Sequence, residues 1–154
     1  MFVYLLVLIV LLTLCAFGIY IYHWEYRKPL LEIYFFSLNR GRSVFLRTSE
    51  NKTILIGGGQ NSEVIREITK ITPFYNRKIN FIIIPSAVPA QIGGLIEVID
   101  RYEVDEIIMP KIMATSTVLT QLIKEIRKKK IHVEEVGKGE ILEIGKNSGR
   151  PSRP

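Results

Sequence analysis

The sequence predicts an α/β protein in which an N-terminal transmembrane helix precedes a mixed β-sheet with helices on one face. Three observations predict this fold class. Residues 2–21 carry no charged side chain. Residues 31–56 contain strand patterns separated by short turns, and strand and helix patterns alternate after them. Residues 81–84 form an apolar run rich in isoleucine, which is typical of a fully buried central strand.

The uncharged N-terminal segment has about the length that a helix needs to cross a bilayer. Aromatic residues, which favour the headgroup zone, gather at its exit: Tyr20, Tyr22, Trp24 and Tyr26. A secretory signal would need a basic start and a small-residue cleavage site, and the sequence has neither. We therefore expect residues 1–28 to form an uncleaved, single-pass anchor in the cell membrane.

The side of the membrane on which the soluble part lies stays open. No Lys or Arg precedes the span, whereas Arg27 and Lys28 follow it, and this asymmetry favours a cytoplasmic domain. Folded domains can nevertheless be translocated regardless of charge. The single cysteine, Cys15, excludes an internal disulfide and a Cys-based zinc site.

The soluble part, residues 29–144, is expected to open with three strands, at residues 31–38, 43–47 and 53–56. Asn61 or Ser62 can cap a helix that ends at Ile71, before Pro73. A central strand at residues 80–84 then leads through a loop into a second helix. The inward positions of this second helix are expected to be Ile92, Leu95, Ile96 and Ile99.

The later elements are a strand, a helix capped by Thr115 or Ser116, and two short strands, expected at residues 106–109, 115–126, 132–136 and 140–144. The tail, residues 145–154, is rich in Gly, Ser, Pro and Arg and is predicted to be disordered. Because each helix is apolar along one side only, the helices should cover one face of the sheet.

The loop after the central strand reads Pro85-Ser86-Ala87-Val88-Pro89-Ala90-Gln91. In α/β proteins, the loop at the carboxyl end of such a strand is where chemistry usually takes place. This loop contains no His, Asp, Glu, Cys or Lys, so nothing in it can bind a metal ion well or transfer a proton. Ser86 has no His or Lys nearby in the sequence to activate it as a nucleophile, so a structural role is expected.

Three stretches follow one another in a recognisable order: Ile33-Tyr34-Phe35-Phe36 with the turn at Gly41, Lys52-Thr53-Ile54-Leu55-Ile56-Gly57-Gly58-Gly59, and residues 81–99 with Ile92-Gly93-Gly94-Leu95. Together they resemble the N-terminal half of the metallo-β-lactamase fold, from residue 31 to about residue 144. Within that family, the chain is most similar to the hydrolase domain of ComEC-type DNA-uptake proteins. The resemblance implies a half domain with a mixed sheet and helices on one face. It also suggests the outer face of the membrane.

The family reads Thr-His-x-His-x-Asp-His over residues 85–91, and these His and Asp side chains hold two metal ions that generate a hydroxide nucleophile. Here the ligand positions are occupied by Ser86, Val88, Ala90 and Gln91. Val and Ala have no lone pair to donate, and a neutral amide or hydroxyl binds zinc poorly. The resemblance therefore implies a pseudoenzyme with no metal and no other cofactor.

The family's second half supplies the second sheet of a sandwich, and the sequence stops where that half would begin. Without it, the inner sheet face would expose a large apolar surface, which soluble monomers rarely tolerate. We expect this face to be covered by a second copy, by another membrane or competence protein, or by the chain's own loop and tail segments.

Glycines and basic residues supply the remaining candidates. Gly57, Gly58 and Gly59 lie between a strand and a helix, where backbone amides can hold a phosphate, but they match no phosphate-binding motif. A tight structural turn is therefore the preferred interpretation, and Gly93 and Gly94 are also interpreted as structural. The net charge of +6 is compatible with nucleic acid. The candidate phosphate or nucleic-acid contacts are Arg40, Arg42, Arg47, Lys128 and Lys129.

Three functions follow from these observations. The preferred one is a membrane-anchored, non-catalytic interaction module. The second is a DNA-contacting accessory of a competence or DNA-uptake system that uses its arginines on phosphates. The third is a metallo-hydrolase site that a partner chain completes.

Overall fold

The computed structural model describes residues 1–25, 31–111, 116–137 and 139. The chain divides into two compact units, Met1–Leu30 and Leu31–Pro154. In the first unit, α1 (Phe2–Glu25) is a continuous helix. Its stretch Phe2–Tyr22 is long and apolar enough to span a membrane. At 1.5 Å per residue these 21 residues extend over about 32 Å, close to the roughly 30 Å of a bilayer's hydrocarbon core.

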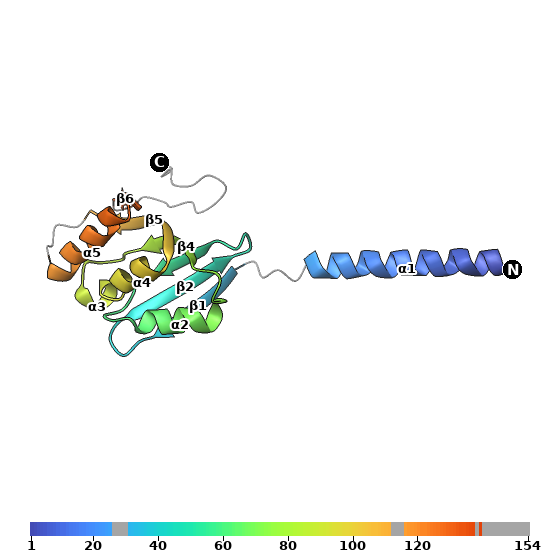
Figure 1. Cartoon of the computed structure of the whole chain (residues 1–154), viewed down its shortest axis with the longest axis horizontal. Coiled ribbons are helices and arrows are strands. Elements are labelled where there is room, and N and C mark those ends of the chain that lie inside the picture. The colour runs from blue at the N-terminus through green and yellow to red at the C-terminus, as the bar shows by residue number, and fades with distance from the viewer. Residues whose placement is uncertain (26–30, 112–115, 138, 140–154) are drawn as a thin grey trace. The chain divides into compact units, whose positions relative to one another are not determined.

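The second unit is built on a six-stranded sheet whose strands follow one another in chain order (Figure 1). The strands are β1 (Leu31–Ser37), β2 (Arg42–Thr48), β3 (Thr53–Ile56), β4 (Lys78–Ile83), β5 (Glu103–Pro110) and β6 (His132–Val136). The pairs β1–β2 and β2–β3 are antiparallel, whereas β3–β4, β4–β5 and β5–β6 are parallel. The prediction of a mixed sheet in an α/β domain is confirmed. The carboxyl ends of the parallel strands meet at one edge of the sheet and their starts meet at the opposite edge.

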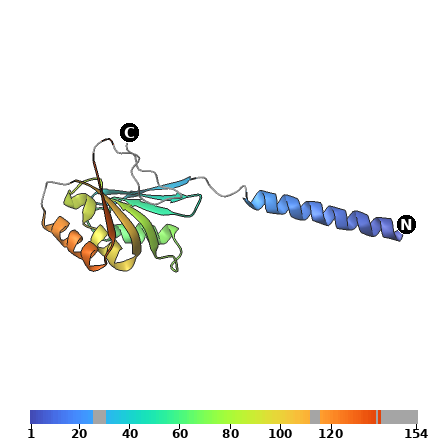
Figure 2. The same cartoon turned by 90° about the horizontal axis from the view of Figure 1, so that it is seen from above.

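The helices of this unit lie on one face of the sheet, as Figure 2 shows for α2, α4 and α5, drawn in green, yellow and orange. The helices are α2 (Glu63–Ile71), α3 (Pro89–Ile92), α4 (Leu95–Arg101) and α5 (Thr117–Lys128). Each of the three longer helices buries one apolar side against the sheet. The buried residues are Val64, Ile65 and Ile68 on α2, Leu95, Val98 and Ile99 on α4, and Leu119, Leu122 and Ile126 on α5. The sheet contributes Phe45, Leu55, Ile82 and Ile107 to the same core. The predicted one-sided helix layer is therefore confirmed.

The predicted single helix around residues 92–99 is wrong in one respect, because two helices replace it. A break at Gly93 and Gly94 separates α3 from α4. At these two positions the backbone packs so closely against Gln60 and Asn61 that no side chain would fit. Ile92, Leu95 and Ile99 are buried as expected, whereas Ile96 is only partly buried.

The predicted N-cap of α5 is confirmed, whereas that of α2 differs from the prediction. Ser116 caps α5, because its hydroxyl accepts a hydrogen bond from the Leu119 amide at 3.1 Å. Ser62 takes the N-cap position of α2, but its side chain makes no capping hydrogen bond. The predicted strand at residues 140–144 and the predicted disordered tail lie outside the described residues.

The second face of the sheet carries two cross-strand rows of apolar side chains. One row runs from Ile33 through Leu46 and Ile54 to Phe81, and the other runs from Phe35 through Val44, Ile56 and Ile83 to Ile108. On the central strands of this face Ile54, Phe81 and Ile108 are buried. At β1, Ile33 and Phe35 are exposed. The tail that was expected to contribute to this cover lies outside the described residues.

Candidate functional site

The loop at residues 85–91 is held by internal hydrogen bonds. The Ser86 hydroxyl donates to Gln91 Oε1 at 2.7 Å, and the Gln91 amide donates to the Val88 carbonyl at 2.8 Å. Val88 is exposed, whereas Ala90 and Gln91 are half-buried. Within the described ranges, no three His, Cys, Asp or Glu side chains are grouped so that they could hold a metal ion. Of the four residues at the positions of the family's metal ligands, Ser86, Val88 and Gln91 therefore hydrogen-bond to one another.

The glycine turn after β3 packs against this loop. The amides of Gly57, Gly58 and Gln60 donate to the carbonyl oxygens of Ile83, Gln91 and Arg40, at 2.9, 2.7 and 3.0 Å. Gly57 and Gly59 have φ values of 68°, which favours glycine. Because the backbone amides of Gly57, Gly58 and Gln60 already donate hydrogen bonds within the fold, little of this turn remains to hold a phosphate. The geometry supports the structural interpretation of these glycines.

Two of the five candidate basic residues are bound within the fold. Arg47 lies 3.2 Å from Glu32 Oε2 through Nη1, and its Nη2 donates to the Ile71 carbonyl at 3.1 Å. It thereby ties β1 and β2 to the end of α2. Lys129 Nζ donates to the carbonyl oxygens of Ile99 and Asp100, both at 2.6 Å, at the end of α4. A cation at a helix C-terminus also interacts favourably with the helix dipole.

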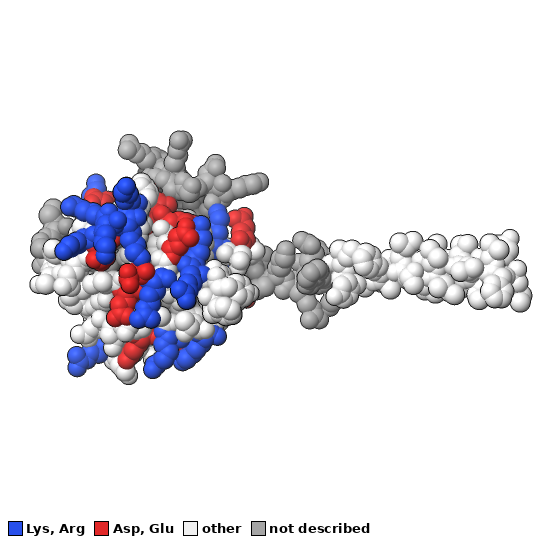
Figure 3. Space-filling model, viewed as in Figure 1, with Lys and Arg blue, Asp and Glu red and all other residues white. Residues whose placement is uncertain are grey.

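The other three candidates are not brought together. Arg40 and Arg42 are exposed at the turn between β1 and β2, at the edge where β3 and β4 end. Lys128 lies at the end of α5 and pairs with Glu125 at 3.2 Å, next to the opposite edge of the sheet. On the face that Figure 3 displays, Lys and Arg side chains are interspersed with Asp and Glu. The five residues therefore form no continuous basic surface.

Part of the second sheet face is apolar and exposed. On β1, Ile33 is 47% exposed and Phe35 is 80% exposed. Both extend the apolar rows that are buried on β3 and β4. In the described part of the sheet, β1 pairs with β2 only, so it is an edge strand. An exposed apolar edge of this kind marks a surface that another chain can cover.

The same face changes character at the other side of the sheet, where it becomes acidic. Glu106 on β5 is 6% exposed, and its Oε1 lies 3.7 Å from Nε2 of His132 on the neighbouring strand. Burial raises the pKa of the Glu106 carboxyl, and the nearby Glu134 carboxylate adds to this, while His132 opposes it. Glu134 Oε2 is buried without a hydrogen-bond partner among the described residues. When Glu106 and Glu134 are both charged, their carboxylates repel each other.

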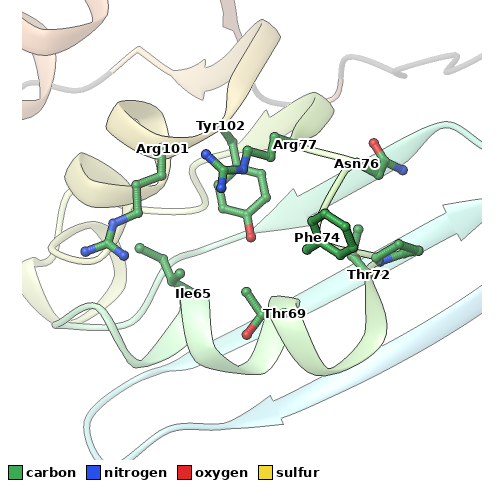
Figure 4. Close-up of a pocket in the computed structure, with 9 residues that line it drawn as sticks. Ile65, Thr69, Thr72, Phe74, Asn76, Arg77, Arg101 and Tyr102 are labelled. Atoms are coloured by element: carbon green, nitrogen blue, oxygen red, sulfur yellow. The ribbon is translucent and has the colours of Figure 1, made fainter.

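A pocket of about 310 Å³ lies between the end of α2, the segment 72–77 and the end of α4. Figure 4 shows the Tyr102 hydroxyl directed into the space between Ile65, Thr69 and Phe74, with Arg77 beside the ring and the Arg101 side chain extending away from the ring on the side of Ile65. Burial raises the pKa of Tyr102, while the two arginines lower it in part. The Thr72 hydroxyl is buried and lacks a hydrogen-bond partner among the described atoms.

This pocket could not be predicted from the sequence, because its residues come from separate segments of the chain. One signal was visible in the sequence: the segment Pro73-Phe74-Tyr75-Asn76-Arg77 places two aromatic residues in a turn between a helix and a strand. Aromatic residues are unusual in a connecting turn, where Gly, Pro, Asn, Asp and Ser dominate.

No model of a known protein family matches the chain, and the comparison with curated proteins finds no match either.

Proposed function

We propose that the protein is a membrane-anchored, non-catalytic interaction module that pairs with a second copy of itself through β1 and the adjoining part of the second sheet face. One observation carries this proposal. The apolar rows of that face continue to the edge strand, where Ile33 and Phe35 are exposed. The resemblance to half of the metallo-β-lactamase fold, with its ligand positions replaced, supports the non-catalytic part.

The anchor in this proposal is α1. Its stretch Phe2–Tyr22 has the length and composition of a membrane span. Anchoring confines all copies to one surface, and this raises the effective concentration at which two copies meet. A modest contact area on each copy is then sufficient for pairing.

Strand β1 lacks the features by which edge strands avoid pairing. It pairs with β2 without a bulge over all seven of its residues, from Leu31 to Ser37. It contains no proline and no lysine, and its single charged side chain, Glu32, is paired with Arg47. Two such strands can pair about a twofold axis and extend the sheet across both copies. Phe35 from each copy would then be removed from water.

In the alternative, another membrane or competence protein covers this face and contacts the same residues. The mass of the complex distinguishes this alternative from a dimer of the chain. The DNA-contacting alternative has less support, because Arg47 and Lys129 bond internally and the other basic residues lie apart. A metallo-hydrolase site completed by a partner would need ligands that the loop at residues 85–91 does not supply.

The test is the mass of the full-length protein in detergent micelles, measured by light scattering with the detergent contribution subtracted. We expect a dimer for the wild type and a monomer for Phe35→Asp, because the charge would be buried at the contact. Val88→Asp is the matched control, because it places the same charge at an exposed apolar position in the loop after β4, outside β1. A wild-type monomer, or a Phe35→Asp dimer with native circular dichroism, would contradict the proposal.

A further inference from the structure

The pocket between α2 and α4 lies at the edge of the sheet where the parallel strands begin, away from the loop at residues 85–91. The segment 72–77 leads into the start of β4, and α4 leads into the start of β5. The Glu103 amide donates to the Arg77 carbonyl at 2.8 Å, which joins these two connections. The pocket is therefore separate from the loop at residues 85–91.

Strand β1 begins at this same edge. Leu31 pairs with Thr48, Arg47 pairs with Thr53, and the Thr53 hydroxyl donates to the Lys78 carbonyl at 3.1 Å. The first residues of β1 and β4 therefore lie at one end of the sheet. Five residues separate Glu25, the last residue of α1, from Leu31. The connection between the anchor and the domain is therefore short in sequence.

The pocket has a positive lining with a neutral hydrogen-bond donor at its centre. Arg77 lines the pocket and makes no side-chain hydrogen bond or ion pair among the described residues, and Arg101 has only an exposed pairing with Glu97 at 3.6 Å. The Tyr102 hydroxyl is protonated at neutral pH, as an ordinary tyrosine is, and burial raises its pKa further. Two guanidinium groups and a phenol are donors that suit a phosphate oxygen.

The rim of the pocket is aromatic and lies in water. Phe74 is 86% exposed and Tyr75 is 77% exposed, and their rings form an edge-to-face pair with centroids 5.6 Å apart. A soluble surface gains little from two such rings, whereas the headgroup zone of a membrane favours them. Basic residues next to exposed aromatic residues are the combination that binds an anionic membrane surface.

We propose that this pocket binds the phosphate of an anionic lipid in the membrane that holds α1, with Phe74 and Tyr75 placed in the headgroup layer. The inference rests on the anchoring part of the proposed function and is independent of the pairing through β1. A soluble phosphate ester would present the same chemistry to Arg77 and Arg101. The exposed aromatic rim and the short connection to α1 favour the lipid.

The experiment uses the full-length chain in nanodiscs, with a tryptophan introduced by Phe74→Trp in a Trp24→Phe background. Trp24 is the sole tryptophan of the sequence, so the introduced residue is the only indole signal. Brominated phosphatidylcholine is the quencher. The nanodiscs contain phosphatidylcholine alone or phosphatidylcholine with one third phosphatidylglycerol. We expect strong quenching with the anionic lipid and weaker quenching without it.

Two matched variants assign the effect to the pocket. Arg77→Gln with Arg101→Gln removes both guanidinium groups and should lower the ratio of docked to undocked domain by roughly thirtyfold. Arg40→Gln with Arg42→Gln makes the same charge change at the opposite edge of the sheet and should leave the quenching unchanged. Equal quenching in both pairs of variants would overturn the proposal.

The remaining outcomes separate the possible failures. A chain that enters nanodiscs but shows no quenching with the anionic lipid overturns the docking proposal and leaves the anchor standing. A chain that does not enter nanodiscs overturns the anchor, and the docking proposal falls with it. A shift of the tryptophan emission with inorganic phosphate in phosphatidylcholine nanodiscs, without an effect of the anionic lipid, would assign the pocket to a soluble phosphate and overturn the lipid assignment.

Discussion

Replacing Gly94 by alanine tests whether the glycines around the loop at residues 85–91 are there for packing. Gly94 has φ −69° and ψ −19°, a conformation that alanine adopts without strain. An added methyl group would nevertheless overlap with the backbone carbonyl oxygens of Gly58 and Asn61. The Gly94 amide also donates to the Gly59 carbonyl at 3.1 Å, so the two segments cannot separate without losing a hydrogen bond.

The expected cost follows from this geometry. Overpacking a tightly packed site typically costs about 1–3 kcal/mol, and the backbone origin of both contacts places Gly94→Ala in the upper part of that range. A loss of about 2–3 kcal/mol should lower the Tm of a domain of this size by roughly 8–12 °C. The measurement is thermal unfolding of the full-length chain in detergent, followed by near-ultraviolet circular dichroism of the aromatic residues.

The control is Gly18→Ala, which adds the same methyl group to α1 at a position with no atom within 4 Å. The Tm of the domain should not change in this variant. If Gly94→Ala unfolded at the wild-type temperature, the close contact between the glycine turn and the start of α4 would be refuted. The turn would then have room, and its amides could again be considered for anion binding.

Two further predictions concern charges inside the domain. The pKa of Glu106 is raised in the native state, so this carboxyl stays protonated to a higher pH than it does in the unfolded chain. The stabilising contribution of Glu106 is therefore present at low pH and is lost as the pH rises through the raised pKa. Glu106→Gln should therefore be more stable than the wild type at pH 7 and equal to it near pH 4, as urea unfolding at both pH values would show; a variant less stable at pH 7 would contradict the assignment. Arg47→Met should cost about 1–2 kcal/mol, because Glu32 and the Ile71 carbonyl lose a partly buried partner. Lys128→Met, which removes an exposed pair with Glu125, should cost at most about 0.5 kcal/mol in the same urea titration, and equal losses in the two variants would contradict the argument.

The fold was predictable where the signal is local. The apolar length of α1, the alternating order of strands and helices, and the cap at Ser116 all depend on residues close together in the chain. The break between α3 and α4 was not predictable in this way. It depends on the close approach of Gly93 and Gly94 to Gln60 and Asn61, which lie more than thirty positions earlier in the sequence.

The candidate sites show the same division. The absence of His, Asp, Glu, Cys and Lys from the loop at residues 85–91 is a property of the sequence alone. The basic residues looked like one group in the sequence. In the fold, Arg47 and Lys129 turn out to bond internally, and Arg40 and Arg42 lie at the opposite edge from Lys128.

The sequence alone determined which segments are apolar, which become strands or helices, and that a long uncharged helix precedes the domain, because these properties depend on neighbouring residues. Tertiary structure alone decided which edge of the sheet receives each loop. Strand order and register placed Arg77, Arg101 and Tyr102 around one pocket and left Ile33 and Phe35 at an open edge. The physical reason is that side-chain direction is set locally, whereas the meeting of distant segments is set by how the sheet pairs and packs.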